Sequence, residues 1–98
     1  MRLKILSSAI DDLYQDRLFY DRQGEGLGEY FFDSLFSDID SLILYAGMHA
    51  KFHGYHRLLS KRFPYAVYYT VQGKEIVLVR RVLDLRQNPA KTRRALQS

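Results

Sequence analysis

Five basic side chains in the second half of the sequence are of the type that binds a phosphate or helps to cleave it. They are Arg57, Lys61, Arg62, Arg81 and Arg86. Cleavage of RNA without a metal needs a base for the 2′-hydroxyl, positive charge at the phosphate and an acid for the leaving oxygen. The basic set could supply the charge. Residues 84–98, however, contain neither tyrosine nor histidine, so this stretch offers no such acid.

A structural role is the alternative for the arginines. Arg57, Arg81 and Arg86 could pair with Asp33 or Asp38 on an acidic helix face, where surface ion pairs contribute about 0–1 kcal/mol. The neighbouring Arg80 and Arg81 lie on one predicted strand, so we expect their side chains to point to opposite faces. Lys61 and Arg62 are expected to be exposed, which suits either docking or solubility.

Three histidines, His49, His53 and His56, raise the question of a metal site. They have no fixed helical spacing over all three, and no nearby carboxylate completes a ligand set. We therefore predict neither a metal nor a cofactor, and expect solvated imidazoles in a loop. His56 stands next to Arg57 and could act as a general base, but spacing alone does not show that it does.

Four tyrosines, Tyr55, Tyr65, Tyr68 and Tyr69, gather on the predicted strands. Aromatic rings beside basic residues can stack on the bases of single-stranded nucleic acid. The large area that each ring buries favours a core role instead. Since Tyr68 lies on the face opposite to Tyr69, only one set is expected to be core. Tyr69 is kept among the candidate binding residues.

Length and composition set the class of protein. A chain of 98 residues is one small domain, and 47% hydrophobic with 27% charged residues is the balance of a soluble globular protein. The absence of cysteine excludes disulfides, cysteine nucleophiles and thiolate metal sites. No apolar stretch approaches the roughly 18 residues of a membrane span, and no signal-peptide pattern is present. We expect a cytoplasmic protein.

Charge is distributed unevenly along the chain. Residues 1–49 hold four basic and nine acidic residues, a net charge of −5, whereas residues 50–98 hold eleven basic and two acidic residues, a net charge of +9. This asymmetry is typical of a protein with a face for an anionic partner, either nucleic acid or an acidic protein segment. The alternative is that the two halves neutralise each other across the fold.

The first half of the chain predicts a strand and a helical hairpin. Residues 2–6 alternate between polar and apolar types, as a half-buried strand does. A first helix is expected over residues 9–23, with its N-terminus capped by Ser7 or Ser8. Its buried face would hold Ile10, Leu13, Tyr14, Leu18 and Tyr20.

A second helix is expected over residues 27–46, after a tight glycine connection. One apolar stripe runs along it at helical spacing, widened by Phe32, Phe36 and Ile43: Phe31, Leu35, Ile39, Leu42 and Ala46. The acidic residues would lie on its outer face: Glu29, Asp33, Asp38 and Asp40. Gly47 is suited to the C-cap.

After Gly47 the pattern changes to that of strands. Residues 55–61, 65–71 and 75–83 predict three strands, with a hairpin turn at 72–74 between the last two. Pro89 suits the first turn of a short basic C-terminal helix. The fold class is therefore α+β, in the order β-α-α-β-β-β, with the helical hairpin packed on a small antiparallel sheet.

Three sequence segments carry a resemblance to a known family, and together they span nearly the whole chain. The first combines Ala9, Asp12, Leu13 and Tyr20 with Gly26-Leu27-Gly28 and Phe32. The second is the most specific, residues 57–67 with Tyr69. The third is Val82-Leu83-Asp84-Leu85-Arg86-Gln87-Asn88-Pro89. The chain resembles the RelE/ParE superfamily of bacterial toxins, nearer its ParE-like branch.

The resemblance implies that residues 1–98 form a single toxin domain of a type II toxin–antitoxin pair. Such a toxin inhibits growth unless a cognate antitoxin binds it. ParE-like toxins poison DNA gyrase, whereas RelE-like toxins cut messenger RNA on the ribosome. Many relatives carry histidine where this chain has Asp84 and a second arginine where it has Gln87. Both departures remove groups that favour a nuclease, so we expect inhibition of gyrase.

The resemblance and the charge pattern together define the candidate site. We expect gyrase or antitoxin to contact Arg57, Lys61, Arg62, Tyr69, Arg81, Arg86, Arg93 and Arg94. The last two belong to a C-terminal helix that resembles the element through which ParE-type toxins are thought to act. If the protein is instead a ribonuclease, the expected catalytic set is Arg57, Lys61, Arg81 and Arg86. A third possibility is a toxin fold that binds antitoxin but has lost toxicity.

Overall fold

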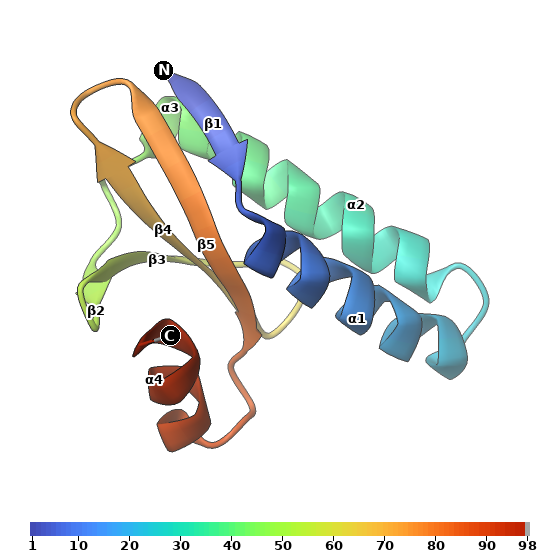
Figure 1. Cartoon of the computed structure of the whole chain (residues 1–98). Coiled ribbons are helices and arrows are strands. Elements are labelled where there is room, and N and C mark those ends of the chain that lie inside the picture. Colours follow the sequence, from blue (N-terminus) through green and yellow to red (C-terminus); the bar gives the residue numbers. More distant parts are fainter. Residues whose placement is uncertain (98) are drawn as a thin grey trace.

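The computed structural model describes residues 1–97 and contains a five-stranded sheet with helices on both faces (Figure 1). The strand order is β1-β5-β4-β3-β2. The hairpin of α1 and α2 lies along one face, and α4 lies against the other. Within residues 1–97, no helix combines the length and apolarity needed to span a membrane. The elements are β1 Arg2–Ile5, α1 Ser7–Gln23, α2 Leu27–Asp40, α3 Leu42–Tyr45, β2 Lys51–Phe52, β3 Tyr55–Leu59, β4 Tyr65–Gln72, β5 Ile76–Asp84 and α4 Pro89–Gln97.

The expected α+β class and the antiparallel meander of β3, β4 and β5 are confirmed. Two strand pairings add to that meander. β1 pairs in parallel with β5, from Arg2 opposite Ile76 to Ile5 opposite Val79, so the sheet is mixed. A two-residue strand, β2, extends the other edge. The helical hairpin is the crossover from β1 to the meander, which the parallel pairing of β1 requires.

The start and the buried face of α1 differ from expectation. Neither serine caps the helix, because Leu6 occupies the N-cap and Ser8 Oγ donates instead to the carbonyl oxygen of Arg80, 2.8 Å away. The buried side chains are Ala9, Asp12 and Leu13. The expectation that Tyr14 and Leu18 are buried is wrong, since both are 54% exposed.

The glycine segment makes the expected tight connection between α1 and α2. Gly26 has φ +80°, a left-handed conformation that glycine adopts without steric cost. Gly28 is buried against the Arg17–Asp21 turn of α1. A Cβ at Gly28 would lie 2.7 Å from the carbonyl oxygen of Arg17 and against the Asp21 carboxylate. A side chain at residue 28 would therefore push the helices apart.

The single helix expected over residues 27–46 is two helices. α2 ends at Asp40, where Ser41 Oγ donates to the carbonyl oxygen of Asp38 at 2.6 Å and competes with helical hydrogen bonding. The apolar stripe is confirmed, with its first four members fully buried. Asp38 does not lie on the outer face as expected. It is 6% exposed and accepts hydrogen bonds from Ser60 Oγ and Lys61 N.

Both faces of the sheet are packed, so the expectation of a single aromatic core is wrong. Tyr65 and Tyr69 face the helical hairpin within the larger core. The opposite face buries Tyr68 under α4, together with Ala66, Leu83 and Leu96. The short C-terminal helix supplies the second layer that the sequence analysis left open.

A β-bulge in β5 determines where its arginines point. Tyr68 pairs with Arg81 and Tyr69 pairs with Val79, which leaves Arg80 without a partner on β4. The alternation of faces is therefore delayed by one residue, and Val79 and Val82 both face the helical hairpin. Arg80 and Arg81 consequently line one pocket on the α4 side. The expectation that they point to opposite faces is wrong.

Candidate functional site: the basic face around α4

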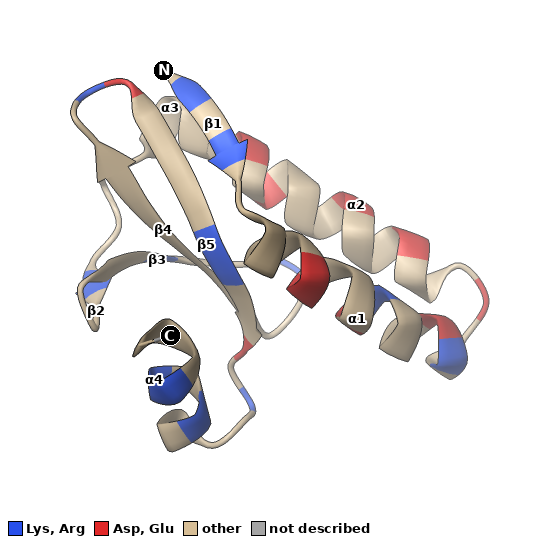
Figure 2. Ribbon diagram, in the orientation of Figure 1, with Lys and Arg blue, Asp and Glu red and all other residues tan. Residues whose placement is uncertain are grey.

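Most of the basic residues that the sequence marks as binding candidates lie on the side of the molecule where α4 packs (Figure 2). Arg93 and Arg94 are exposed on α4 itself. Arg57 on β3 and Arg81 on β5 lie on the sheet face that α4 covers, and Arg86 lies in the loop from β5 to α4. We call this surface the α4 face.

Local contacts hold α4 against the sheet. The Asn88 side-chain oxygen accepts a hydrogen bond from Ala90 N at 2.8 Å, which caps the helix ahead of Pro89. At the other end Leu96 is 4% exposed, and its carbonyl oxygen accepts from the Tyr55 hydroxyl at 2.8 Å. A helix this short is marginal alone, so its order depends on this packing.

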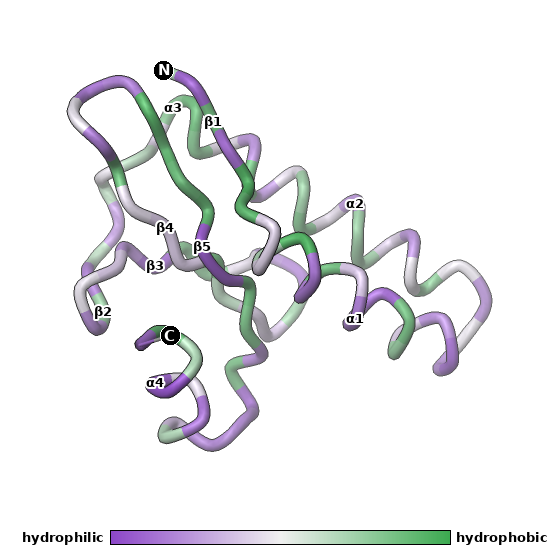
Figure 3. Tube along the Cα trace, in the orientation of Figure 1, coloured by the Kyte–Doolittle hydropathy of each residue, from purple (hydrophilic) through white to green (hydrophobic). Residues whose placement is uncertain are grey.

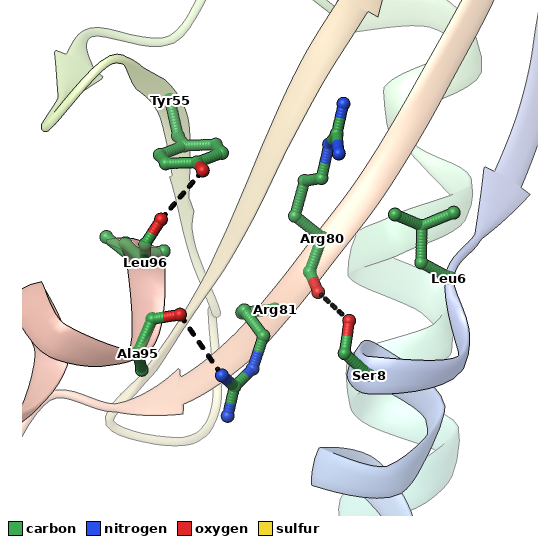
Figure 4. A pocket seen from close by; sticks show the side chains of 7 residues that line it. All are labelled: Leu6, Ser8, Tyr55, Arg80, Arg81, Ala95 and Leu96. Atoms are coloured by element: carbon green, nitrogen blue, oxygen red, sulfur yellow. Dashed lines mark hydrogen bonds between the residues drawn. The ribbon is translucent and has the colours of Figure 1, made fainter. Parts of the chain in front are cut away.

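Arg81 forms the most extensive polar contact of the site. Its Nε and Nη2 donate to the two oxygens of Asp12 on α1, at 2.8 and 2.9 Å. Nη1 donates to the carbonyl oxygen of Ala95 on α4 (Figure 4). The hydrogen bond to Asp12 raises the pKa of Arg81, more than partial burial lowers it. Arg81 thus connects β5 to both α1 and α4.

Asp12 is the residue that the sequence analysis missed. It is 8% exposed and accepts a third hydrogen bond, from the buried Val82 N at 2.9 Å. Its burial could have been predicted, because Asp12 lies on the same helical face as Ala9 and Leu13. A carboxylate there must be buried and paired.

Arg86 is paired within its own loop. Its guanidinium donates to both oxygens of Asp84, at 3.0 and 2.9 Å. Partial burial alone would raise the pKa of Asp84, but hydrogen bonds from Arg86 outweigh it and hold that pKa below its usual value. The sequence analysis gave ion pairing as the structural alternative for Arg81 and Arg86. Both arginines are paired, but with Asp12 and Asp84 and not with the expected Asp33 or Asp38. The Arg86 side chain is 56% exposed.

Arg57 lies apart from both ion pairs. Its guanidinium stacks over the Phe52 ring, 4.5 Å from the centroid, and lines a pocket of about 90 Å³ beside Tyr68 and Gln87. It forms none of the ion pairs found among residues 1–97, where Arg81 and Arg86 are the paired arginines. Phe52 belongs to β2, which the sequence analysis did not predict.

Lys61 and Arg62 stand outside the α4 face. Both are exposed in the loop from β3 to β4, where Lys61 N bonds Asp38 on α2. Arg62 Nη1 donates to the Tyr30 hydroxyl of α2 at 3.2 Å, and this hydrogen bond raises the pKa of Arg62. The loop therefore contacts the helical hairpin.

The residues of the expected ribonuclease set lie in different pockets and loops. Arg57 and Arg81 both pair with Tyr68, from the two neighbouring strands, which places their backbones about 10 Å apart. The pockets lined by Arg57 and by Arg81 are different, and Lys61 lies toward the helical hairpin. Cleavage would need these charges around one group.

Tyr69 is a core residue, which corrects its place among the surface binding candidates. Its ring is fully buried, and its hydroxyl accepts from Gly47 N at 3.0 Å and bonds His49 Nδ1. The His56 ring stacks on Tyr69 and its Nδ1 bonds the carbonyl oxygen of His49 at 2.7 Å. Two of the three histidines thus help to order the chain after α3. No group of three metal-binding side chains is found within residues 1–97.

A carboxyl-rich pocket of about 180 Å³ opens between α1, the end of β5 and α4. Its acidic lining is Asp12, Asp16 and Asp84, with Arg81 and Lys91 as the basic members. Burial, followed by the charges of Asp12 and Asp84, raises the pKa of Asp16 to about 6. A hydrogen bond with Tyr65 and the charge of Arg86 oppose this shift.

The raised pKa of Asp16 predicts a stability change with pH. The folded protein holds this proton more tightly than the unfolded chain does, so Asp16 costs stability as the pH rises from about 4 through 6. Asp16→Asn is expected to stabilise the protein at pH 7.5 relative to its effect at pH 4.5. Urea unfolding of both proteins at the two pH values measures this difference.

The parent and the variant must be compared because His49 changes the stability of both with pH, in the direction opposite to Asp16. Burial lowers the pKa of His49, so its contribution is lost as the pH falls. Subtracting the two proteins removes the His49 effect. A variant whose stability difference from the parent is the same at both pH values would contradict the role assigned to Asp16.

Comparison with known proteins identifies the fold. The chain matches no protein-family model and no curated protein sequence. It is similar to a solved chain of the chromosomal ParDE toxin–antitoxin system from P. aeruginosa, with a TM-score of 0.78 and 20% sequence identity. The similarity covers 88% of this chain and 97% of that one. The α+β fold expected from the sequence is therefore the fold of a solved chain from a ParDE system.

Proposed function

We propose that this chain is the toxin of a type II toxin–antitoxin pair and inhibits DNA gyrase through protein–protein contact, as a single domain without a cofactor. The observation that carries the proposal is the likeness, over nearly the whole fold, to a chain of a ParDE toxin–antitoxin system. Three sequence segments support it independently, since they carry a ParE-like pattern across residues 9–89.

The geometry of the basic residues favours binding over RNA cleavage. The guanidiniums of Arg81 and Arg86 are each neutralised by an aspartate, at Asp12 and Asp84. Arg57 is separated from them by the buried Tyr68 ring. What the α4 face presents outward is a basic helix with Arg93 and Arg94 exposed. Such a surface suits an acidic protein face.

The proposal includes an antitoxin as partner. An amphipathic, acidic segment would complement the basic second half and lay apolar side chains in a groove. Tyr14 and Leu18 offer apolar contacts, because they are exposed one turn apart on α1. Beside them Phe32 packs against Tyr14 and carries the Arg17 guanidinium over its ring. Exposed apolar neighbours of this kind mark protein-binding surfaces.

The test is to induce the chain alone in a bacterial host and to follow DNA and protein synthesis separately. Purified gyrase supercoiling is assayed beside it. Early loss of DNA integrity with inhibited supercoiling supports the proposal. Early collapse of translation with cleaved messages would replace gyrase with the ribosome as target. Normal growth with fully active gyrase would contradict toxicity and leave antitoxin binding as the only part of the proposal still standing.

Arg86→Ala is expected to weaken inhibition of supercoiling about tenfold while the fold persists. Arg86 is more than half exposed and its Asp84 pair is a surface pair, so its loss costs about 1 kcal/mol or less. Inhibitory concentration and urea unfolding are measured together. Arg22→Ala, at the exposed end of α1, is the matched control and should change neither. Insoluble Arg86→Ala protein with full activity in its soluble fraction would assign Arg86 a structural role.

A further inference from the structure

A pocket next to the α4 face has no role in the proposed function. It opens between the start of α1, β5 and the last turn of α4 and has a volume of about 310 Å³ (Figure 4). Leu6, Ala95 and Leu96 contribute apolar walls. The polar part of the lining is Ser8, Tyr55, Arg80 and Arg81. This volume is at the lower end of the range for small-molecule sites.

The two arginines of the pocket differ in how they are neutralised. Arg81 is bound to both oxygens of Asp12 and turns toward Ala95. The Arg80 side chain extends along β5 in the other direction (Figure 4). Its Nε donates to Thr70 Oγ1 at 3.1 Å. Within residues 1–97 no carboxylate pairs with Arg80, and its two terminal nitrogens have no hydrogen-bond partner.

Two features of the fold fix the position of the Arg80 side chain. The β-bulge turns Arg80 to the α4 side of the sheet, and the Thr70 hydrogen bond fixes its Nε. Its side chain is partly buried, where solvent screens charge less than at an open surface. A guanidinium held in this way presents Nη1 and Nη2 as a fork.

The chemistry of the walls selects the kind of anion. A planar fork matches the two oxygens of a carboxylate. Because Asp12 neutralises Arg81, the pocket carries one uncompensated positive charge, which suits a monoanion better than a phosphate chain. Leu6 and Leu96 favour an apolar group beside that anion.

We propose that this pocket binds a carboxylate that carries an adjoining apolar group, with Arg80 Nη1 and Nη2 donating to its two oxygens. The carboxylate belongs either to a free organic acid or to an acidic side chain of a peptide with apolar neighbours. The binding assay does not depend on gyrase inhibition, so this proposal and the proposed function can fail separately.

The test is a nuclear magnetic resonance titration of the full chain with matched probes. 3-Phenylpropionate is compared with its neutral amide, 3-phenylpropanamide, and with inorganic phosphate. We expect millimolar binding of the acid, with shifts at Leu6 and Leu96, and about tenfold weaker binding of the amide, because charge-assisted hydrogen bonds are lost. This comparison uses the unaltered chain, so it does not depend on the folding of any variant.

Two variants then assign the effect to Arg80. Arg80→Gln should weaken binding of 3-phenylpropionate about tenfold and bring the acid to the level of the amide. Lys74→Gln removes the same charge from the exposed turn between β4 and β5 and should leave binding unchanged. Acid and amide that bind equally, phosphate that binds more tightly than the acid, or no binding at all would each overturn the proposal.

A peptide pair distinguishes the two sources of the carboxylate. Acetyl-Leu-Glu-Leu-amide is titrated against its glutamine counterpart in the same assay. Tighter binding of the glutamate peptide than of 3-phenylpropionate would assign the pocket to an acidic segment of a partner protein. The reverse order, with both still dependent on Arg80, would assign it to a small organic acid.

Discussion

Asp12→Ala is expected to lower the free energy of unfolding by about 3 kcal/mol, the lower end of the cost of removing one member of a buried ion pair. Asp12 is 8% exposed, and its carboxylate accepts from two Arg81 nitrogens and from the buried Val82 N. Alanine would leave all three donors without their acceptor. The lower end applies because the Arg81 side chain keeps 26% exposure.

Urea unfolding and thermal melting measure the effect of Asp12→Ala. A domain of this size loses about 4–8 °C of melting temperature for each kcal/mol, so a fall of more than about 10 °C is expected. Asp11→Ala is the matched control, because its side chain is exposed one residue away and should change stability by about 0.5 kcal/mol or less. Equal effects of the two substitutions would show that the Arg81 pair contributes little.

Gly28→Ala is the second large effect, with an expected loss of about 2–3 kcal/mol from overpacking. The new Cβ would meet the Arg17 carbonyl oxygen at 2.7 Å and the Asp21 carboxylate. The side chain of Asp21 can move away, but the backbone of α1 can give way only if the two helices separate. Urea unfolding measures the loss.

A double variant distinguishes the contact with the Asp21 side chain from the contact with the Arg17 carbonyl oxygen. In Asp21→Ala the carboxylate is gone, and adding Gly28→Ala should still destabilise the protein because the Arg17 carbonyl remains. Full recovery in the double variant would mean that only the Asp21 side chain had limited the approach of α1 and α2.

The helical hairpin and the strands under it could be predicted because they follow from periodicity, whereas the α4 layer on the other face could not. The stripe from Phe31 to Leu42 and the alternation of residues 2–5 each describe one face of one element. The break at Ser41 escaped prediction, because the apolar stripe continues through it and only a side-chain hydrogen bond to the Asp38 carbonyl oxygen marks the position.

The candidate site was less accessible to sequence reasoning, since it depends on contacts between distant segments. Tyr14 and Leu18 fit the helical pattern of a buried face. In the folded protein, however, α1 packs through the side that holds Asp12, and both of these residues are exposed. Arg81 meets Asp12 across 69 positions of sequence. Neither the burial of Tyr69 nor the pairing of Arg86 within its own loop has a signature in residue spacing.

The one-residue bulge at Arg80 also makes β5 a strand of two phases. Before it, inward positions are odd-numbered, as at Val77 and Val79, and after it the inward position is even, at Val82. Deleting Arg80 or Arg81 would restore a uniform phase with Val79 and Val82 still inward, but it would leave one arginine where two now line the pocket on the α4 side. The bulge therefore gives one face of β5 two neighbouring cationic positions, which a regular strand with alternating faces would not place side by side.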